Sequence, residues 1–203
     1  MESKDKQFRN AIDKIEIRSI QDNTDENIST LEGYIAKFNS PTVLWKGYNE
    51  QLDPHCFDKT LSDGHNIFLL YAHDISKPLA STRTGTLILT ADAIGLHFTA
   101  TVDTSISYIN DTVKLIKAGL TVGCSFGFWI ISDNEVYDAI TDTYIDTLLE
   151  VQLFEGSVLS NPQYTDTDVS ARAKDRVEEN QNKIKELEQR ELELQLIEIE
   201  MEL

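Results

Sequence analysis

The stretch Gly123-Cys124-Ser125-Phe126-Gly127-Phe128 carries the most structural information in this chain. Apolar side chains alternate here with small or polar ones, which is typical of a β-strand with one buried face. The apolar face comprises Val122, Cys124, Phe126 and Phe128. Ser125 lies on the other face, between Gly123 and Gly127. A hydroxyl flanked by residues without a Cβ sits on nearly bare backbone, so we expect a substrate backbone to approach it closely.

Two further runs carry polar residues that could act together with Ser125. They are Leu70-Tyr71-Ala72-His73-Asp74 and Leu153-Phe154-Glu155-Gly156-Ser157. Serine is a poor nucleophile unless a base takes its proton, and the base works best when a third group orients it. His73 and Glu155 are residue types that fill these two roles. The three runs together therefore offer a nucleophile, a base and a carboxylate.

Strand alternation places both partner residues on apolar faces. His73 and Glu155 would each share a face with three apolar side chains: Ile67, Leu69 and Tyr71 for the first, and Leu149, Val151 and Leu153 for the second. An unpaired buried carboxylate costs several kcal/mol, so Glu155 would need a partner, for which a histidine is suitable. Simpler interpretations stay open. A lone histidine is commonly a core or surface residue, and Glu155 could follow the end of its strand and lie in water.

Other chemistry-bearing residues fit less well. Cys124 adjoins Ser125 and could be the nucleophile of a Cys/His pair, but strand alternation predicts a buried structural thiol there. The remaining histidines and cysteine do not show zinc-ligand spacing: His55, His65, His97 and Cys56. The sequence holds no P-loop, no dinucleotide fingerprint and no GxSxG motif.

Composition excludes several classes of partner. The chain has 203 residues and a net charge of -17, which argues against nucleic acid and anionic membranes because both repel an acidic surface. No apolar run approaches the roughly 20 residues that a membrane-spanning helix needs. The first ten residues are polar, so no signal peptide is expected. Two cysteines do not make a disulfide framework, which favours a reducing compartment.

Periodicity along the chain predicts a domain with many strands and one or two helices. We expect strands over residues 14–20, 31–38, 67–73, 86–90, 95–102, 121–131 and 144–154, the fourth and fifth forming a hairpin. A helix is expected over 104–118, ending at Gly119, and a helical turn over 58–62. Residues 43–57 are aromatic and irregular. These elements predict an α+β or barrel-like domain.

The character of the sequence changes near residue 171. Residues 171–203 contain no Gly or Pro and are rich in Glu, Leu, Ile and Lys, which predicts one long amphipathic helix. Its apolar spacing is too ragged for a dimeric coiled coil, and its acidic balance argues against membrane binding. We therefore expect a domain over residues 1–170 and an acidic helix over 171–203 that binds a partner helix.

These motifs, in this order, resemble the tailed-phage prohead protease family, which shares a fold with the herpesvirus assemblin proteases. The resemblance covers about residues 14–170, and the strongest match is the G-x-S-F-G-F nucleophile strand around Ser125. Four other segments carry it: Gly33 to Ser40; Gly47 to Phe57, in which His55-Cys56 replaces the usual Gly-Ala; Leu69 to Asp74; and Leu153 to Tyr164, in which Gln163 replaces the usual Ala. Gly85-Thr86-Leu87 and Gly95-Leu96 resemble the family's hairpin.

The resemblance implies a site and an activity. Carried over by position, the family's nucleophile falls on Ser125, its base on His73 and its acidic third member on Glu155. The herpesvirus relatives use a second histidine as the third member, whereas this sequence has Glu155 there. Backbone N–H groups around residues 156–160 are the expected oxyanion donors. No metal or cofactor is needed for this chemistry.

The resemblance also implies a biological setting. The chain would be a serine endopeptidase that cleaves the major capsid protein or its scaffold segment, and itself, in the host cytoplasm inside an assembling procapsid. The fold would be a β-barrel ringed by helices. The resemblance also allows a homodimer, as in the herpesvirus relatives. Two alternatives stay open: a non-catalytic capsid-assembly or scaffold protein that retains the protease fold, and a cysteine peptidase that uses Cys124.

Overall fold

The computed structural model describes residues 7–10, 18–20, 27–121, 123–160 and 189–190. The chain divides into two units, Met1–Thr165 and Asp166–Leu203. Within the second unit the description is limited to residues 189–190, which are helical. The remainder of the helix expected over 171–203 lies outside the described residues, and the domain boundary near residue 170 stays a prediction.

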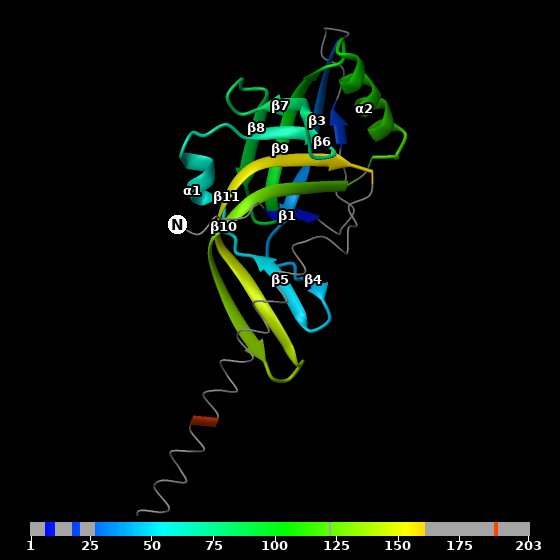
Figure 1. The fold of residues 1–203 in the computed structure, drawn as a ribbon. Helices are drawn as coiled ribbons and strands as arrows, with labels where there is room; N and C mark the ends of the chain where they lie inside the picture. Colours follow the sequence, from blue (N-terminus) through cyan, green and yellow to red (C-terminus); the bar gives the residue numbers. More distant parts are fainter. Residues whose placement is uncertain (1–6, 11–17, 21–26, 122, 161–188, 191–203) are drawn as a thin grey trace, which may run out of the picture. The chain divides into compact units, whose positions relative to one another are not determined.

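The larger of two β-sheets has seven strands and carries the residues of interest (Figure 1). Its main path runs β1 (Gln7–Asn10), β10 (Gly123–Asp138), β11 (Thr143–Leu159), β5 (Tyr48–Leu52) and β4 (Thr42–Trp45). Two more strands join the sheet, β6 (Phe68–Tyr71) and β7 (Asp74–Ser81). Strand β6 pairs with the C-terminal end of β11, and β7 pairs with β6. Strands β10 and β11 form one long antiparallel hairpin at the centre of the sheet.

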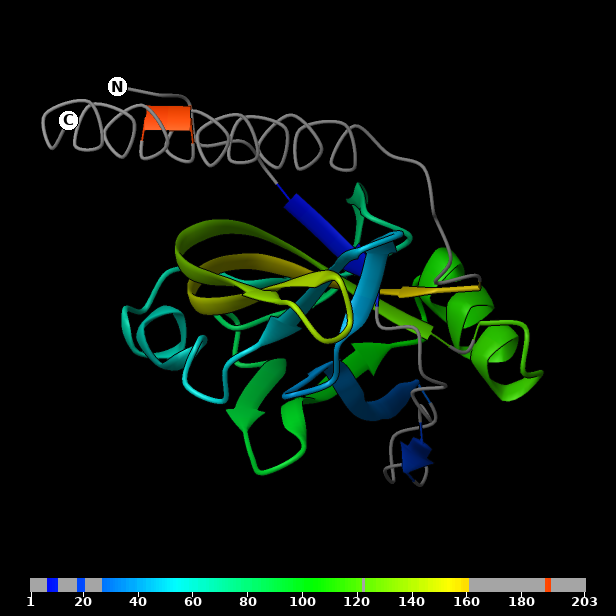
Figure 2. The same cartoon turned by 90° about the horizontal axis from the view of Figure 1, so that it is seen from below.

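The smaller sheet is antiparallel, in the order β2 (Arg18–Ile20), β3 (Ile28–Lys37), β9 (Gly95–Asp103) and β8 (Leu87–Ala91). The described part of Met1–Thr165 contains two helices, α1 (Asp58–Ser62) and α2 (Ser107–Lys117), which lie on opposite sides of the sheets (Figures 1 and 2). Helix α2 buries the apolar stripe that its sequence predicts, and it ends where Gly119 adopts a φ of +71°.

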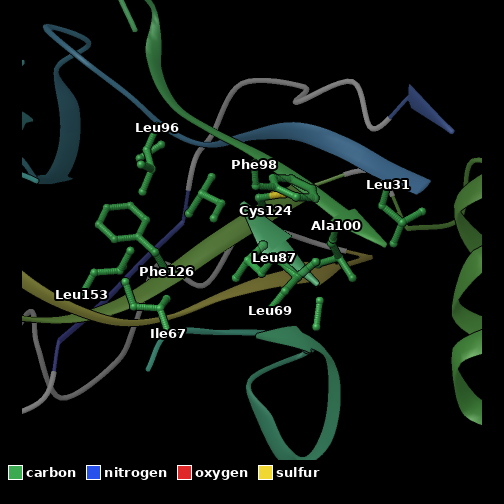
Figure 3. Close-up of a cluster of buried hydrophobic side chains, with 14 of the residues drawn as sticks. Leu31, Ile67, Leu69, Leu87, Leu96, Phe98, Ala100, Cys124, Phe126 and Leu153 are labelled. Carbon is green, nitrogen blue, oxygen red and sulfur yellow. The ribbon is translucent and has the colours of Figure 1, made fainter. Parts of the chain in front are cut away.

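Apolar side chains from both sheets form one core (Figure 3). Leu31, Leu96 and Phe98 come from the smaller sheet, and Cys124 and Phe126 come from β10. Their positions follow the alternation of their strands, because every second residue of a strand points to the same face. The apolar face predicted for the strand around Ser125 is therefore confirmed for Cys124, Phe126 and Phe128, which are buried, whereas Val122 lies outside the described residues.

The burial of a side chain in this core predicts how much its removal lowers the free energy of unfolding. Phe98 on β9 is fully buried, so Phe98→Ala should lower the free energy of unfolding by about 3–5 kcal/mol. Ile88 lies on the neighbouring strand β8 and is 60% exposed, so Ile88→Ala should change it by less than about 0.5 kcal/mol. Urea unfolding of both variants measures the difference. Equal losses would show that the difference in burial between Phe98 and Ile88 does not set the cost of removing them.

The structure corrects part of the fold expectation. The α+β class holds broadly, but within the described residues the two sheets stay open and do not close into a barrel. The same residues contain two short helices on opposite sides, which do not ring the sheets. The hairpin of β8 and β9 and the turn at 58–62 are confirmed, whereas β1, β4, β5 and β7 were not expected as strands.

Strand β11 changes partners along its length, and this change builds the region around Ser125. It pairs in parallel with β5 over Tyr144–Leu148 and with β6 over Glu155–Val158. Between these stretches the α1 segment takes over: the Val151 N–H donates to the Cys56 carbonyl, and the Leu153 N–H donates to Thr60 Oγ1, both at 3.0 Å. The edge of β11 just before Glu155 is thus anchored.

His65 adds a further bond to this anchor. Its ring nitrogens contact Asp63 Oδ1 and the Leu153 carbonyl oxygen, and both of these atoms are hydrogen-bond acceptors. Burial by itself lowers the pKa of His65, but these two hydrogen bonds and the negative charge of Asp63 outweigh it, so the pKa is raised. An imidazole that faces two acceptors satisfies both only when it is protonated.

Candidate active site

Ser125 lies on β10 with a strand paired to it on each side. It is opposite Asn10 of β1 and opposite Ser157 of β11, and it is completely enclosed. We expected a substrate backbone to approach Ser125 closely, but in this structure the backbone beside it is the chain's own β1. The side of the sheet that Ser125 faces follows from alternation, since its neighbours Cys124 and Phe126 point into the core.

A β-bulge in β11 places Glu155 on the same side of the sheet as Ser125. Gly127 pairs with Glu155 but Phe128 pairs with Leu153, so Phe154 is an extra residue without its own partner position on β10. Gly127 and Phe128 point to opposite faces, and so therefore do Glu155 and Leu153. The expectation that Glu155 shares the apolar face of Leu153 is wrong, because the bulge reverses the alternation.

His73 comes from a tight turn and not from a strand, which corrects the expected strand over 67–73. Strand β6 ends at Tyr71, which pairs with Asp74 of β7, so Ala72 and His73 form a two-residue hairpin connection. Their φ angles are +52° and +61°, the left-handed values of a type I′ turn that glycine and asparagine favour. Each non-glycine residue in this conformation costs about 1–2 kcal/mol, so other contacts must hold it.

Hydrogen bonds join the turn to Glu155. His73 Nδ1 is 2.6 Å from Glu155 Oε1, and the other carboxylate oxygen, Oε2, accepts a hydrogen bond of 2.6 Å from the Ser157 hydroxyl. The same hydroxyl accepts the His73 backbone N–H at 3.0 Å. Glu155 is buried, while the His73 side chain is 28% exposed. The buried carboxylate therefore has the histidine partner that the sequence predicted for it.

The structure thus brings two of the predicted residues into direct contact and places the third on the adjacent strand. Ser125 is the register partner of Ser157, and Glu155 is the register partner of Gly127, two residues beyond Ser125. Within the described residues, no three His, Cys, Asp or Glu side chains are grouped so that they could hold a metal ion. In the same part of the chain, no helix is long and apolar enough to cross a membrane.

Comparison with known proteins identifies the family of this chain. The family model described as "Caudovirus prohead serine protease" matches residues 13–183. The chain belongs to the caudovirus prohead serine protease family. Searches of curated proteins and of solved structures found no match. Family membership supports a protease role in phage maturation, within the procapsid in the host cell and with a capsid or scaffold protein as substrate.

Gly127 of this prohead protease domain provides the space that the carboxylate occupies. A Cβ at position 127 would lie 2.7 Å from Glu155 Oε1 and 2.5 Å from Phe154 Cε2. Carbon atoms do not approach other atoms this closely without displacing them. The glycine predicted to leave bare backbone beside Ser125 therefore has a second consequence, because it admits the Glu155 side chain across the strand pair.

We expect Gly127→Ala to reduce peptidase activity by about tenfold or more, because the new methyl group displaces the Glu155 carboxylate from His73. The matched control is Gly156→Ala on the partner strand. Its Cβ would lie 2.6 Å from Ile35 Cδ1, so it should cost about 1–3 kcal/mol of stability by overpacking and disturb Glu155 less. Melting temperature and peptide cleavage, measured on both variants, separate the two effects. If both variants lose activity in proportion to stability, Gly127 has no special place beside the carboxylate.

The other cysteine and histidine candidates are not part of this arrangement. Cys124 is fully buried on the core face, and burial raises its pKa to about 12, so the thiol stays protonated at neutral pH. His97 lies on β9 of the smaller sheet, where its ring packs edge-on against Tyr34 at 5.1 Å. His55 is exposed and pairs with Asp58.

Ser157 lies in the segment that resembles the prohead protease motif, but the sequence alone indicated no role for it. The signal that could have identified it is its spacing: Ser157 follows Glu155 by two residues, so both share a strand face. The structure corrects the expected oxyanion donors for residues 156–158. Over Glu155–Val158, β11 is paired with β10 on one side and β6 on the other, so the backbone N–H groups there are used in the sheet.

Proposed function

We propose that this chain is a serine endopeptidase that cleaves capsid or scaffold segments, and itself, during procapsid maturation. Ser125 is the nucleophile, His73 the general base and Glu155 the group that orients the base. The observation that carries the proposal is the 2.6 Å contact between His73 Nδ1 and Glu155 Oε1, on the side of the sheet that Ser125 faces. Membership in a serine protease family supports it independently.

The hydrogen bond to Glu155 explains how His73 can act as a base. A carboxylate oxygen accepts a proton donor, so the neutral imidazole carries its proton on Nδ1 and has a lone pair on Nε2. Nε2 can then take the Ser125 hydroxyl proton as the serine oxygen attacks the peptide carbonyl carbon. The positive charge that forms on the imidazole is stabilised by Glu155, which is buried and therefore weakly screened by water.

The second half of the reaction uses the same groups in reverse. His73 gives the proton to the departing amine as the C–N bond breaks, which leaves an ester between Ser125 and the acyl half of the substrate. Water then gives a proton to His73 and attacks the ester carbonyl, and the Ser125 oxygen regains its proton when the acid product leaves. No step requires a group from outside the chain except water.

Incubation of the full-length protein, followed by intact mass spectrometry, tests the proposal. We expect masses that correspond to fragments of the chain, and we expect a fluorophosphonate, which reacts with activated serines, to add one label. A protein that stays at full mass and takes no label would instead fit the non-catalytic assembly protein that retains the protease fold. The position of each cut also gives the residues on both sides of the cleaved bond.

A further inference from the structure

Ser157 is fully buried and lies opposite Ser125 on the neighbouring strand. Its hydroxyl contacts two of the residues assigned to catalysis, and each contact has a definite direction. The hydroxyl has one proton, which it donates to Glu155 Oε2 at 2.6 Å. Its oxygen accepts the backbone N–H of His73 at 3.0 Å. Since that single proton points to the carboxylate, Ser157 is not itself arranged as a nucleophile.

The contact with the His73 backbone stabilises the conformation of the turn. Ala72 and His73 both have positive φ angles, which side chains with a Cβ disfavour. Such a conformation persists only where the surroundings determine it. Two hydrogen bonds from β11 supply this constraint: the Ala72 N–H donates to the Val158 carbonyl oxygen, and the His73 N–H donates to Ser157 Oγ, both at 3.0 Å.

The contact with Glu155 fixes the orientation of the carboxylate. A buried carboxylate with one partner can rotate about its last bond, and both its oxygens then compete for the same donor. Because Ser157 holds Oε2, Oε1 is directed to His73 Nδ1. One hydroxyl therefore ties together the main chain of the base and the side chain of its orienting acid, and it does so on the strand that pairs with Ser125.

We propose that Ser157 is the positioning residue of this active site and fixes His73 and Glu155 relative to each other. This inference rests on the proposed function. Ser157 acts through His73 and Glu155 and does not touch the reacting atoms. Its removal should therefore slow the chemical step and leave substrate binding nearly unchanged.

The test compares Ser157→Ala with Ser81→Ala in the full-length protein. Ser81 is also a buried strand serine, but its hydroxyl bonds to Thr84 in the turn that leads out of β7. We expect Ser157→Ala to slow fluorophosphonate labelling and the kcat for a cleaved peptide about 100-fold, with KM within about twofold of wild type. Ser81→Ala should label at nearly the wild-type rate. Ser157→Thr, which keeps the hydroxyl, should restore part of the loss.

A spectroscopic measurement excludes a merely structural role. A proton held between an imidazole and a carboxylate gives a far-downfield ¹H NMR signal, and Glu155→Gln identifies it in this protein. We expect Ser157→Ala to shift or broaden this signal and Ser81→Ala to leave it in place. If Ser157→Ala does not fold, Ser157→Cys keeps the shape of the side chain and replaces the hydroxyl with a weak donor, so it serves in the same comparison.

The outcomes distinguish this inference from the proposed function. If the wild-type protein takes no label, the proposed function is wrong, and this inference is wrong with it. Wild-type labelling together with equally fast labelling of Ser157→Ala would overturn the positioning role alone. Equal losses in Ser157→Ala and Ser81→Ala would also overturn it, because they would show a general effect of removing buried hydroxyls.

Discussion

Ser125→Ala should abolish cleavage and fluorophosphonate labelling and leave the protein folded. The substitution removes only the hydroxyl that forms the ester, and alanine fits a fully enclosed position whose side chain is already small. Loss of a nucleophile that acts together with a base lowers kcat by about six orders of magnitude in enzymes of this type, so no cleavage should be measurable. Intact mass over time and circular dichroism give both results on one sample.

Cys124→Ala is the matched control for the nucleophile. Cys124 adjoins Ser125 but lies on the core face, and its pKa is raised to about 12 by burial. The variant should keep its activity and lose roughly 1 kcal/mol of stability, as for a small truncation in the core. Cleavage by Ser125→Ala, together with its loss in Cys124→Ala, would reverse the assignment and make the chain a cysteine peptidase.

His73→Ala should be as inactive as Ser125→Ala, because the nucleophile has no base without the imidazole. Glu155→Gln should be damaging but need not silence the enzyme completely. Its amide oxygen can still accept the His73 Nδ1 proton, but a neutral amide does not stabilise the imidazolium by charge. If the amide N–H₂ group of the variant faces Ser157, the serine hydroxyl no longer donates to residue 155, and its oxygen accepts from the amide instead.

The rates of peptide cleavage by the two variants show how much the base and its orienting carboxylate each contribute. The expected order is wild type, then Glu155→Gln at a small fraction of that rate, then His73→Ala at background. Wild-type rates in Glu155→Gln would exclude Glu155 as the third member and would make His97→Ala the next variant to measure. The position of His97 on the smaller sheet, against Tyr34, makes that outcome unexpected.

Much of the local structure could be predicted from residue patterns. The β8–β9 hairpin, helix α2 and the apolar face of β10 each follow from a period of two or of three to four residues, which local sequence expresses directly. The unexpected strands lack this signal. Strand β7, for example, contains Lys77 and Pro78, and it exists because β6 lies beside it.

The candidate site shows the same division. The sequence by itself determined the chemical groups, a serine between glycines on one strand and a histidine and a carboxylate near the ends of two others. It also indicated the family, because the order of several short motifs is a property of sequence alone. The positions of these groups relative to one another could not be predicted from the sequence, since strand alternation assigned His73 to a strand and Glu155 to the face of Leu153.

The tertiary structure decided the placement through two local irregularities. The bulge at Phe154 turns Glu155 to the side of Ser125, and the left-handed turn at Ala72 and His73 brings the imidazole to it. The positive φ angles of the turn are disfavoured for residues with a Cβ, and the bulge leaves no periodic signal in the sequence. Both irregularities are stabilised by bonds between segments far apart in the chain, such as that from the His73 N–H to Ser157, and local sequence carries no signal for such bonds.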